Sequence, residues 1–181
     1  MKTLIELGAV LISKPFIEDK RFEKTIILII EHNTNGTVGL ILNKETSTNI
    51  NETIKDFSAF NINLNYGGPV DVNSLFFIHK YPDIILDSKK IKNGLFLGGN
   101  LEDVIKGLHS REISNNLISF FVGYSGWEQG QLEAEIEEGS WILHQIDVNQ
   151  LNQNLNWSQL LININQEYEI WATAPSDFHL N

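Results

Sequence analysis

The sequence predicts an α+β fold with a mainly antiparallel sheet, built as a single domain over residues 1–181. Two observations predict the class: a hairpin pattern near the N-terminus, and strand-like runs joined by polar turns instead of by regular β-α-β alternation. A third observation is the composition, with 42% hydrophobic and 20% charged residues, which is typical of a globular chain. A chain of 181 residues is long enough to bury one core without disulfides, and it contains no cysteine.

The N-terminal run MKTLIELGAVLIS is expected to form a strand of the mature protein. A signal peptide is the alternative, but Glu6 interrupts the apolar run, only Lys2 precedes it, and no A-x-A cleavage site follows. No apolar run approaches the roughly 18 residues that a membrane-spanning helix needs. These features favour a cytoplasmic protein that is not inserted in a membrane.

A hairpin follows this strand. Ile26–Ile30 and Val38–Leu42 are apolar runs, and the Asn35-Gly36 pair between them is typical of a type I′ turn. Both faces of the hairpin are largely apolar, so we expect it to be central and covered on both sides. With Asn35 and Gly36 as the loop, the facing pairs are His32 with Gly39, Glu31 with Leu40, and Leu28 with Asn43, and Ile30 shares a face with Ile41.

The rest of the chain alternates between short runs and turns, without an internal repeat. Lys89, Lys90 and Lys92 are expected to form a solvated turn. The other expected elements are a short helix capped by Asn51, strands over 75–79, 117–122 and 140–146, apolar runs over 84–86 and 94–97, a helix opened by Asn100, a helix over 157–164, and an edge strand or docked tail over 168–172.

Residues 120–141, FFVGYSGWEQGQLEAEIEEGSW, predict a strand, a glycine-rich turn and an acidic helix. Ser125 and Glu128 have the spacing of a capping box, Gly126 and Gly130 would share a helix face, and Gly139 can close the helix in the left-handed conformation. Within the helix, Leu132 and Ile136 point to the core, whereas Glu128, Glu135, Glu137 and Glu138 face water. The helix macrodipole disfavours Glu137 and Glu138, so a partner surface is an alternative to a solvated acidic face.

The net charge of −10 lies entirely in the second half of the chain. Residues 1–92 contain 11 basic and 11 acidic side chains, whereas residues 93–181 contain Lys106 and Arg111 against 12 carboxylates. Such a field repels phosphate backbones, so we expect no direct nucleic-acid binding. All four tryptophans lie in this acidic half, and an exposed one would be an interface anchor.

Catalytic and metal-binding patterns are weak. Ser125 sits in a Gly123-Tyr124-Ser125-Gly126-Trp127 turn, but a nucleophile elbow needs a second glycine where Trp127 stands. The five histidines are at least 30 residues apart and form no metal-ligand motif. We therefore expect no catalytic nucleophile, no metal and no cofactor.

The motifs taken together resemble those of the AlgH/YqgE family of bacterial proteins. The matching segments are Gly8–Ser13 with Pro15 and Phe22; Glu31-His32, Gly36, Gly39-Leu40 and Asn43; Tyr66-Gly67-Gly68-Pro69-Val70 with His79; Gly123-Tyr124, Gly126-Trp127, Gly130–Glu133 and Glu135 with Trp141; and the ending Trp171–Pro175. Thr37, Ser125 and Glu128-Gln129 depart from the usual residues of the family. The resemblance implies a strongly bent sheet, a flattened half-barrel with helices packed against it. The family is labelled as transcriptional regulators and has no established enzyme activity.

We expect the residues of these motifs to converge on one cleft. The candidate ligand- or partner-binding residues are Glu31, His32, Asn43, Gly67, Gly68, Pro69, Trp127, Gln131 and Glu133. The leading hypothesis is a cytoplasmic regulatory or binding module that acts through a protein or small-molecule partner. The alternatives are a hydrolase-like enzyme using Glu31, His32 or Glu133 as acid or base, and a direct DNA-binding transcription factor. The ligand, the partner and the oligomeric state stay open.

Overall fold

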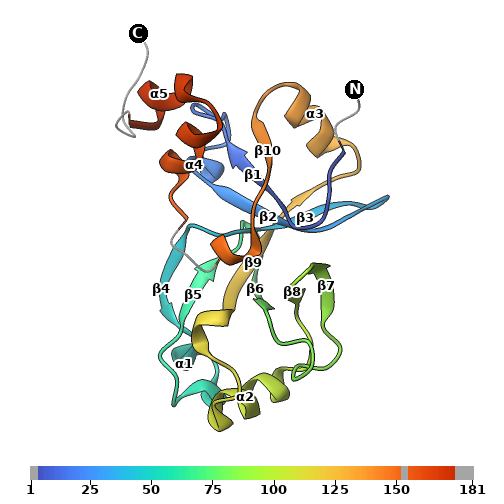
Figure 1. The fold of residues 1–181 in the computed structure, drawn as a ribbon, viewed down its shortest axis with the longest axis vertical. Coiled ribbons are helices and arrows are strands. Elements are labelled where there is room, and N and C mark those ends of the chain that lie inside the picture. The colour runs from blue at the N-terminus through green and yellow to red at the C-terminus, as the bar shows by residue number, and fades with distance from the viewer. Residues whose placement is uncertain (1–3, 152–154, 174–181) are drawn as a thin grey trace.

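One long strand, β9 (Ile118–Trp127), belongs to both halves of the fold (Figure 1). The computed structural model describes residues 4–151 and 155–173. The other strands are β1 (Ala9–Ser13), β2 (Ile26–Asn33), β3 (Gly36–Ile41), β4 (Glu45–Asn49), β5 (Asn63–Tyr66), β6 (Val70–His79), β7 (Lys89–Lys92), β8 (Leu95–Leu97) and β10 (Trp141–Gln145). The helices are α1 (Ile50–Thr53), α2 (Leu101–Ser110), α3 (Gln131–Glu137), α4 (Trp157–Ile164) and α5 (Glu169–Thr173).

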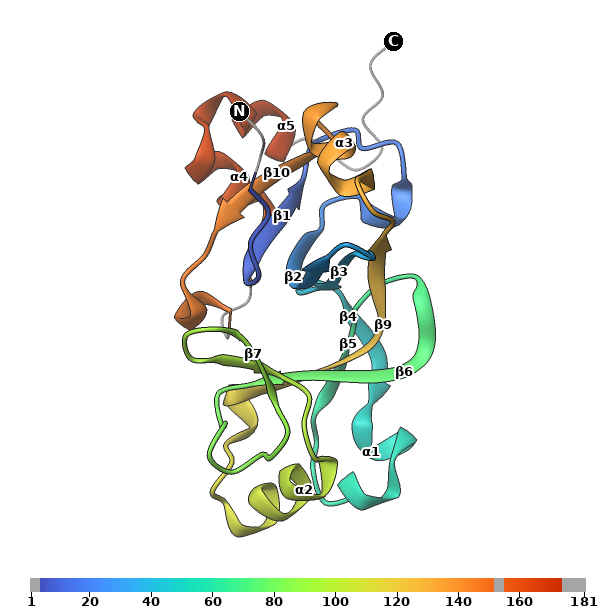
Figure 2. The ribbon, with the colours of Figure 1, turned by 90° about the vertical axis from the view of Figure 1, so that its right-hand side faces the viewer.

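The strands form one bent sheet in the order β10-β1-β2-β3-β9-β6-β8-β7, and β4 and β5 pair beside it. Only the β5–β9 pair is parallel among the described strands. We call β1, β2, β3 and β10 with α3, α4 and α5 the upper lobe, and β4 to β8 with α1 and α2 the lower lobe (Figures 1 and 2). The expected α+β class with a strongly bent, mainly antiparallel sheet is confirmed.

The bend lies at Gly123 in the middle of β9. Before it, Ile118–Val122 pair with β6; after it, Ser125–Trp127 pair with β3. Gly123 has a φ of +69°, and a Cβ there would lie 2.4 Å from the Gly68 carbonyl oxygen. Glycine is therefore required both for the turn and for the close crossing of the two chains.

The upper sheet is covered on both faces, as the apolar hairpin predicts. Leu28 and Ile30 belong to a core cluster that includes Trp157, Leu161 and Ala172 from α4 and α5. Ile27 and Ile29 belong to the opposite cluster, which α3 completes with Leu132. A third cluster fills the lower lobe between β9 and helices α1 and α2.

The register predicted for the hairpin is wrong. Leu28 pairs with Leu40 and His32 with Thr37, because Thr34 and Asn35 form the loop and the register shifts between Ile29 and Glu31. The Asn33 side chain accepts a 2.7 Å hydrogen bond from the Asn35 backbone N–H, which starts the turn one position earlier than the Asn-Gly pair suggests. In consequence Ile30 and Ile41 lie in opposite core clusters.

The capping box predicted after β9 is also wrong. β9 continues to Trp127, and α3 begins only at Gln131 behind Gly130, which has a φ of +78°. Gly126 therefore lies in a strand and shares no helix face with Gly130. The buried Ser125 hydroxyl donates to the Gly67 carbonyl oxygen at 3.2 Å, so strand pairing and this bond take the place of a cap. Gly139, with a φ of +87°, ends the helix as expected.

Most other elements agree with the patterns. Helices α2 and α4 begin at Leu101 and Trp157, and Leu132 and Ile136 pack against the core. The corrections are that 168–172 are helical, that Lys89–Lys92 form strand β7 and not a turn, that 84–86 form no strand, and that Asn49 precedes α1 with Asn51 inside it. Ala174, Pro175 and His179 lie outside the described residues.

Candidate functional site

Two neighbouring cavities meet at Gly126, an exposed glycine of β9. They share Val70, Gly126, Trp127 and Gln131. The tryptophan cavity, about 350 Å³, is lined in addition by Ile17, Glu18, Asp19, Arg21, Phe22, Pro69, Glu135, Glu138, Ser140 and Trp141. The hairpin cavity, about 560 Å³, is lined in addition by Glu31, Asn33, Asn35, Gly36, Thr37, Val38, Tyr124 and Glu128.

The Glu135 carboxylate forms the polar centre of the tryptophan cavity. Its Oε2 accepts hydrogen bonds from the indole N–H groups of Trp127 at 2.9 Å and Trp141 at 2.7 Å. Its Oε1 accepts one from the Gln131 side-chain amide at 2.8 Å. Three donors thus hold one carboxylate, and they join β9, α3 and β10 at a single point.

Aromatic rings form the wall of the same cavity. Phe22 stacks on Trp127 with ring centroids 6.2 Å apart and meets Trp141 edge-on at 5.6 Å. Trp127 is only 6% exposed and Trp141 only 2%, so they serve as a rigid wall and not as protruding anchors. The exposed apolar side chain that lines the cavity with them is Val70, which is 38% exposed.

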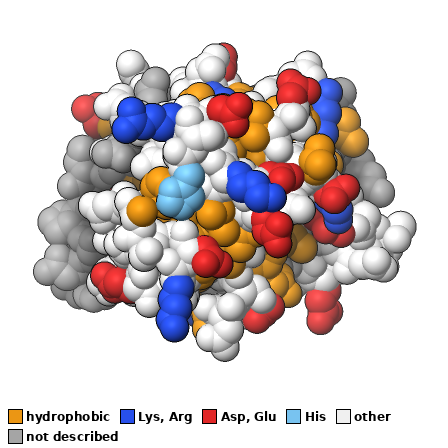
Figure 3. Space-filling view, turned by 90° about the horizontal axis from the view of Figure 1, so that it is seen from below, with side chains coloured by type: hydrophobic (Ala, Val, Ile, Leu, Met, Phe, Trp, Pro, Cys, Tyr) orange, Lys and Arg blue, Asp and Glu red, His pale blue; other side chains and the backbone are white. Residues whose placement is uncertain are grey.

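The two cavities carry a strong excess of negative charge. The only basic side chain among their lining residues is Arg21, and it pairs with Asp19 at 2.7 Å. The hydrogen bond from Arg21 holds the pKa of Asp19 below its usual value. The lining carboxylates are Glu18, Asp19, Glu31, Glu128, Glu135 and Glu138. At the lower-lobe end of the molecule, in contrast, acidic and basic side chains are interspersed (Figure 3).

Four of the sequence-derived candidate residues line these cavities. Glu31 borders the hairpin cavity, Pro69 borders the tryptophan cavity, and Trp127 and Gln131 border both. The structure therefore brings together part of the motif set, from β2, the β5–β6 connection, β9 and α3.

The other candidates line neither cavity. His32 Nδ1 lies 2.8 Å from the Thr37 hydroxyl, which closes the base of the hairpin. Asn43 accepts from the Ile26 N–H and donates to the Lys24 carbonyl oxygen, each at 2.9 Å, which fixes a turn. Gly67 and Gly68 pack against the backbone of β9, where a Cβ would lie 2.2 Å from Gly123 O and Tyr124 C respectively. Glu133 is half-buried on α3 and lines no cavity described here.

Sequence reasoning missed Glu135, Arg21 and Val70 as lining residues, and it offered Glu138 only as part of an alternative partner surface on the acidic helix. Glu135 was expected to face water, because a helical carboxylate usually does. A signal was available: Gln131 and Glu135 are four residues apart, and a tryptophan flanks the helix on each side. The poor placement of Glu138 at the helix C-terminus was the other signal, since the macrodipole gives no reason for a carboxylate there.

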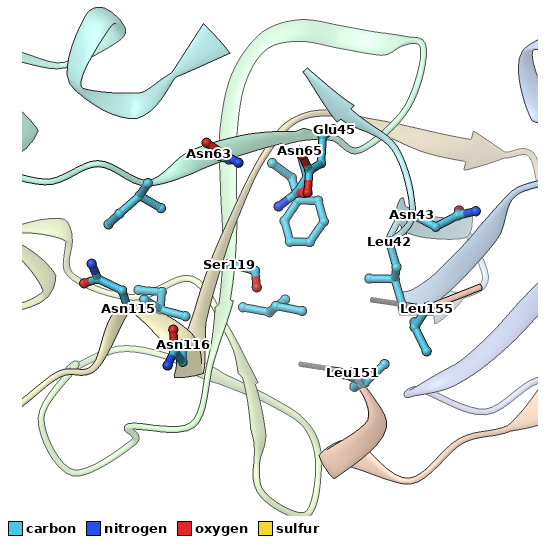
Figure 4. A pocket seen from close by; sticks show the side chains of 14 residues that line it. Leu42, Asn43, Glu45, Asn63, Asn65, Asn115, Asn116, Ser119, Leu151 and Leu155 are labelled. Carbon is cyan, nitrogen blue, oxygen red and sulfur yellow. The ribbon is translucent and has the colours of Figure 1, made fainter. Parts of the chain in front are cut away.

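The cavity in Figure 4, about 550 Å³, lies between the lobes. Asn63, Asn65, Asn115 and Asn116 from the lower lobe face Leu42, Leu151 and Leu155 from the upper lobe. Of the candidate residues only Asn43 borders it, and both polar atoms of that amide already have partners. Asn63, Asn115 and Asn116 are exposed, so water satisfies their amides.

Among the described residues, the side chains considered for hydrolytic chemistry are not brought together. Ser125 is fully buried, so its hydroxyl is not offered to a substrate. Glu31, His32 and Glu133 do not surround one cavity. No group of three or more metal-ligating side chains occurs in the part of the chain that the structure describes. Within 4–151 and 155–173, no helix is long and apolar enough to cross a membrane.

Comparisons with known proteins agree on one group. The sequence model of a family described as AlgH-like matches residues 10–169. A UPF0301 protein of Cytophaga hutchinsonii is 36% identical over 182 residues, covering 98% of this chain and 100% of that protein. A UPF0301 protein of Parabacteroides distasonis is 35% identical over 179 residues, covering 96% and 90%.

Solved structures show the same fold. The solution structure of the AlgH protein from Pseudomonas aeruginosa has a TM-score of 0.70 at 24% identity, with 97% of this chain and 99% of that chain covered. A crystal structure of a Corynebacterium diphtheriae protein has a TM-score of 0.75 at 21% identity, with 96% and 95% covered.

Proposed function

The chain belongs to the AlgH-like family, and from that premise we propose that it is a cytoplasmic regulatory binding module that recognises a protein partner. The recognition surface consists of the tryptophan and hairpin cavities, which we call together the β9 cleft. In this proposal the chain acts on transcription or on another process through its partner, and it has no catalytic step of its own.

The observation that carries the proposal is the cleft's combination of a rigid aromatic wall with an exposed apolar side chain, Val70, at its rim. Trp127 and Trp141 are fixed by Glu135, and Val70 stands beside them at 38% exposure. Rigid aromatic groups next to exposed apolar residues and a polar rim are typical of protein interfaces. Because the wall is already ordered, a partner that docks there does not have to immobilise it.

The two alternatives have less support. Six carboxylates line the cleft, and such a surface repels the phosphates of DNA. An enzyme would need a nucleophile or an acid–base pair facing the cleft. Of its candidates Glu31, His32 and Glu133, only Glu31 lines the cleft, and the His32 ring is bonded to Thr37.

The test is photo-crosslinking in the bacterium that encodes the chain. A photoreactive amino acid at Val70, in the cleft, is compared with one at Leu86, which is 61% exposed and lies in the lower lobe. We expect a discrete protein adduct, identified by mass spectrometry, from position 70 only. The adduct should weaken with Glu138→Lys and persist with Glu137→Lys, because Glu138 lines the cleft and Glu137 does not. Equal crosslinking from both positions would contradict the proposal.

A further inference from the structure

The outer edge of β9 is unpaired next to the cleft. Within the described strands, Ile118 and Ser119 pair with β6, and Phe120–Val122 lie between β5 and β6. Ser125–Trp127 pair only with β3. On the opposite side, the pairing with β6 ends at Val70 and Tyr124. The sheet therefore has a short open edge between Val70 and the start of α3 at Gln131.

The backbone of Gly126 is directed toward this open edge. In an antiparallel pair, alternate residues point both their N–H and C=O groups to the same side. A Cβ on Gly36 of β3 would lie 2.2 Å from the Trp127 carbonyl oxygen, so that oxygen faces β3. By alternation Gly126 points away from β3, and it is the exposed residue between the buried Ser125 and Trp127.

The two cavities lie on either side of this edge. The tryptophan cavity borders the face that carries Phe22 and Trp141, and the hairpin cavity borders the face that carries Val38 and Tyr124. In an extended strand, successive side chains point to opposite faces. A segment laid along Gly126 would therefore send its side chains alternately into the two cavities.

Both cavities are lined by carboxylates, and both therefore favour basic side chains. Glu31 and Glu128 lie on the hairpin side, and Glu18 and Glu138 lie on the tryptophan side. The one basic residue among the lining side chains, Arg21, is already paired with Asp19. Phe22, which is half-buried and lines the tryptophan cavity, also offers aromatic surface against which the alkyl chain of an arginine or lysine can pack.

We propose that an extended, arginine- or lysine-bearing segment of the partner protein adds to the sheet as a short strand along Gly126, with its side chains in the two cavities. The inference rests on the proposed function and specifies the partner's chemistry. Main-chain pairing supplies affinity, and the carboxylates supply selectivity for basic sequences. A nucleic acid is disfavoured by charge, and a second copy of the chain is the other occupant that the test addresses.

The probe is a blocked seven-residue peptide of alternating arginine and valine, studied with the full chain. One control peptide is the glutamate–valine equivalent. The other is the arginine–valine peptide N-methylated at three consecutive central amides, so that N–H donors are lost from both edges of the peptide strand and it cannot pair in either orientation. Binding is measured by fluorescence anisotropy at low and high salt, and the Gly126 amide is followed by NMR and hydrogen exchange. We expect the arginine–valine peptide alone to bind, to weaken with salt, and to protect the Gly126 amide.

Two kinds of protein variant complete the test. Gly126→Val adds a side chain on the face of β9 that carries Tyr124, so it obstructs the hairpin cavity beside the open edge. Because Gly126 has an ordinary φ and its Cβ would meet only the Tyr124 ring, at 3.2 Å, the variant should fold. It should weaken peptide binding at least about tenfold, the loss of 1.4 kcal/mol. Glu138→Lys should weaken it about three- to fivefold, whereas its neighbour Glu137→Lys, with the same net charge, should not.

Several outcomes overturn the inference. Equal binding of the N-methylated peptide would show that no strand is added, and equal binding of the glutamate peptide would remove the charge argument. Sedimentation that shows self-association abolished by Gly126→Val would identify a second copy as the occupant. A partner crosslinked at Val70 together with no peptide binding at Gly126 would leave the proposed function standing and this inference refuted. Peptide binding without any crosslinked partner would show that the edge accepts a basic strand, but it would refute the proposed function and with it the assignment of that strand to a protein partner.

Discussion

Glu135 shows how a single carboxylate can organise a surface. Both indole N–H groups and the Gln131 amide donate to it, so β9, α3 and β10 are fixed relative to one another. The sequence predicted that Glu135 faces water. The two indole donors were not predicted, because Trp127 and Trp141 come to the same side of the helix only in the folded chain. Trp127 and Gln131 were predictable as cleft residues from their motif, whereas the role of Asn43 in a turn depended on contacts with Lys24 and Ile26.

Replacing Glu135 by alanine should lower the free energy of unfolding by about 2–4 kcal/mol, since two largely buried indole donors lose their acceptor. The measurement is urea denaturation followed by tryptophan fluorescence. Glu133→Ala is the control, because Glu133 is half-buried on the same helix and has no hydrogen bond to a described side chain; it should cost less than about 1 kcal/mol. Equal losses in the two variants would show that the indole bonds contribute little.

His79 is a buried titratable residue in the lower lobe. Its Nε2–H donates to the Gly98 carbonyl oxygen at 2.9 Å, and its Nδ1 accepts from the Tyr81 N–H at 3.1 Å. This arrangement fits the neutral ring. Burial lowers the pKa of His79 below its ordinary value of 6.5.

Stability should therefore fall as the pH drops below about 6.5, because the unfolded chain then binds a proton that the folded chain does not. Urea midpoints between pH 7 and pH 5 measure this slope. His79→Gln should flatten it, even though the variant loses some stability at pH 7. A steep slope that persists in His79→Gln would assign the effect to other groups.

At the scale of elements, the starts of helices α2 and α4 were predicted, whereas the starts of α1 and α3 and the helical state of α5 were not. The ends of α2 and α4 are set by local signals: Asn100 and Asn156 accept hydrogen bonds from the backbone N–H groups of Glu102 and Gln159, in the first helical turns. Strand ends and registers depend on partners far along the chain. β9 extends to Trp127 because β3 pairs with it, and the hairpin register follows an Asn33 turn that competes with the Asn-Gly signal.

The bend of β9 should be very sensitive to substitution. Gly123→Ala combines a positive φ with overlap against Gly68 O, so we expect a loss of more than about 3 kcal/mol or no folded protein. Gly94→Ala is the matched control: its φ of +79° is similar, but no atom lies within 4 Å of a Cβ there. It should cost only about 1–2 kcal/mol. Thermal unfolding compares the two, and similar losses would show that the close crossing is not what constrains β9.

At the scale of the whole molecule, the structure shows where acidic side chains gather: six of them line the β9 cleft. The acidic half of the chain supplies Glu128, Glu135 and Glu138 to the cleft, and the charge-balanced half adds Glu18, Asp19 and Glu31. The composition alone indicated the sign of the field. The concentration of carboxylates around one edge depended on the fold, because these residues come from four separate segments.

The full chain should not bind duplex DNA of arbitrary sequence, even at about 50 mM salt, because its field repels the phosphates. Fluorescence anisotropy with a labelled duplex measures this. Exchanging Glu138 for lysine reverses one charge and should still give no binding, since five lining carboxylates remain. Binding that declines steeply with added salt would contradict the prediction and revive the DNA-binding alternative.

The pairing of β1 with β10 has a consequence for synthesis of the chain. Ala9–Ser13 align with Trp141–Gln145, and the Trp157 indole also donates to the Ser13 carbonyl oxygen at 2.8 Å. On the ribosome, more than a hundred further residues must be synthesised after β1 before β10, its outer neighbour in the sheet, emerges. Until then the nascent protein presents an apolar strand edge that can pair with other chains. We expect its yield in the cell to depend on chaperones that shield that edge during translation.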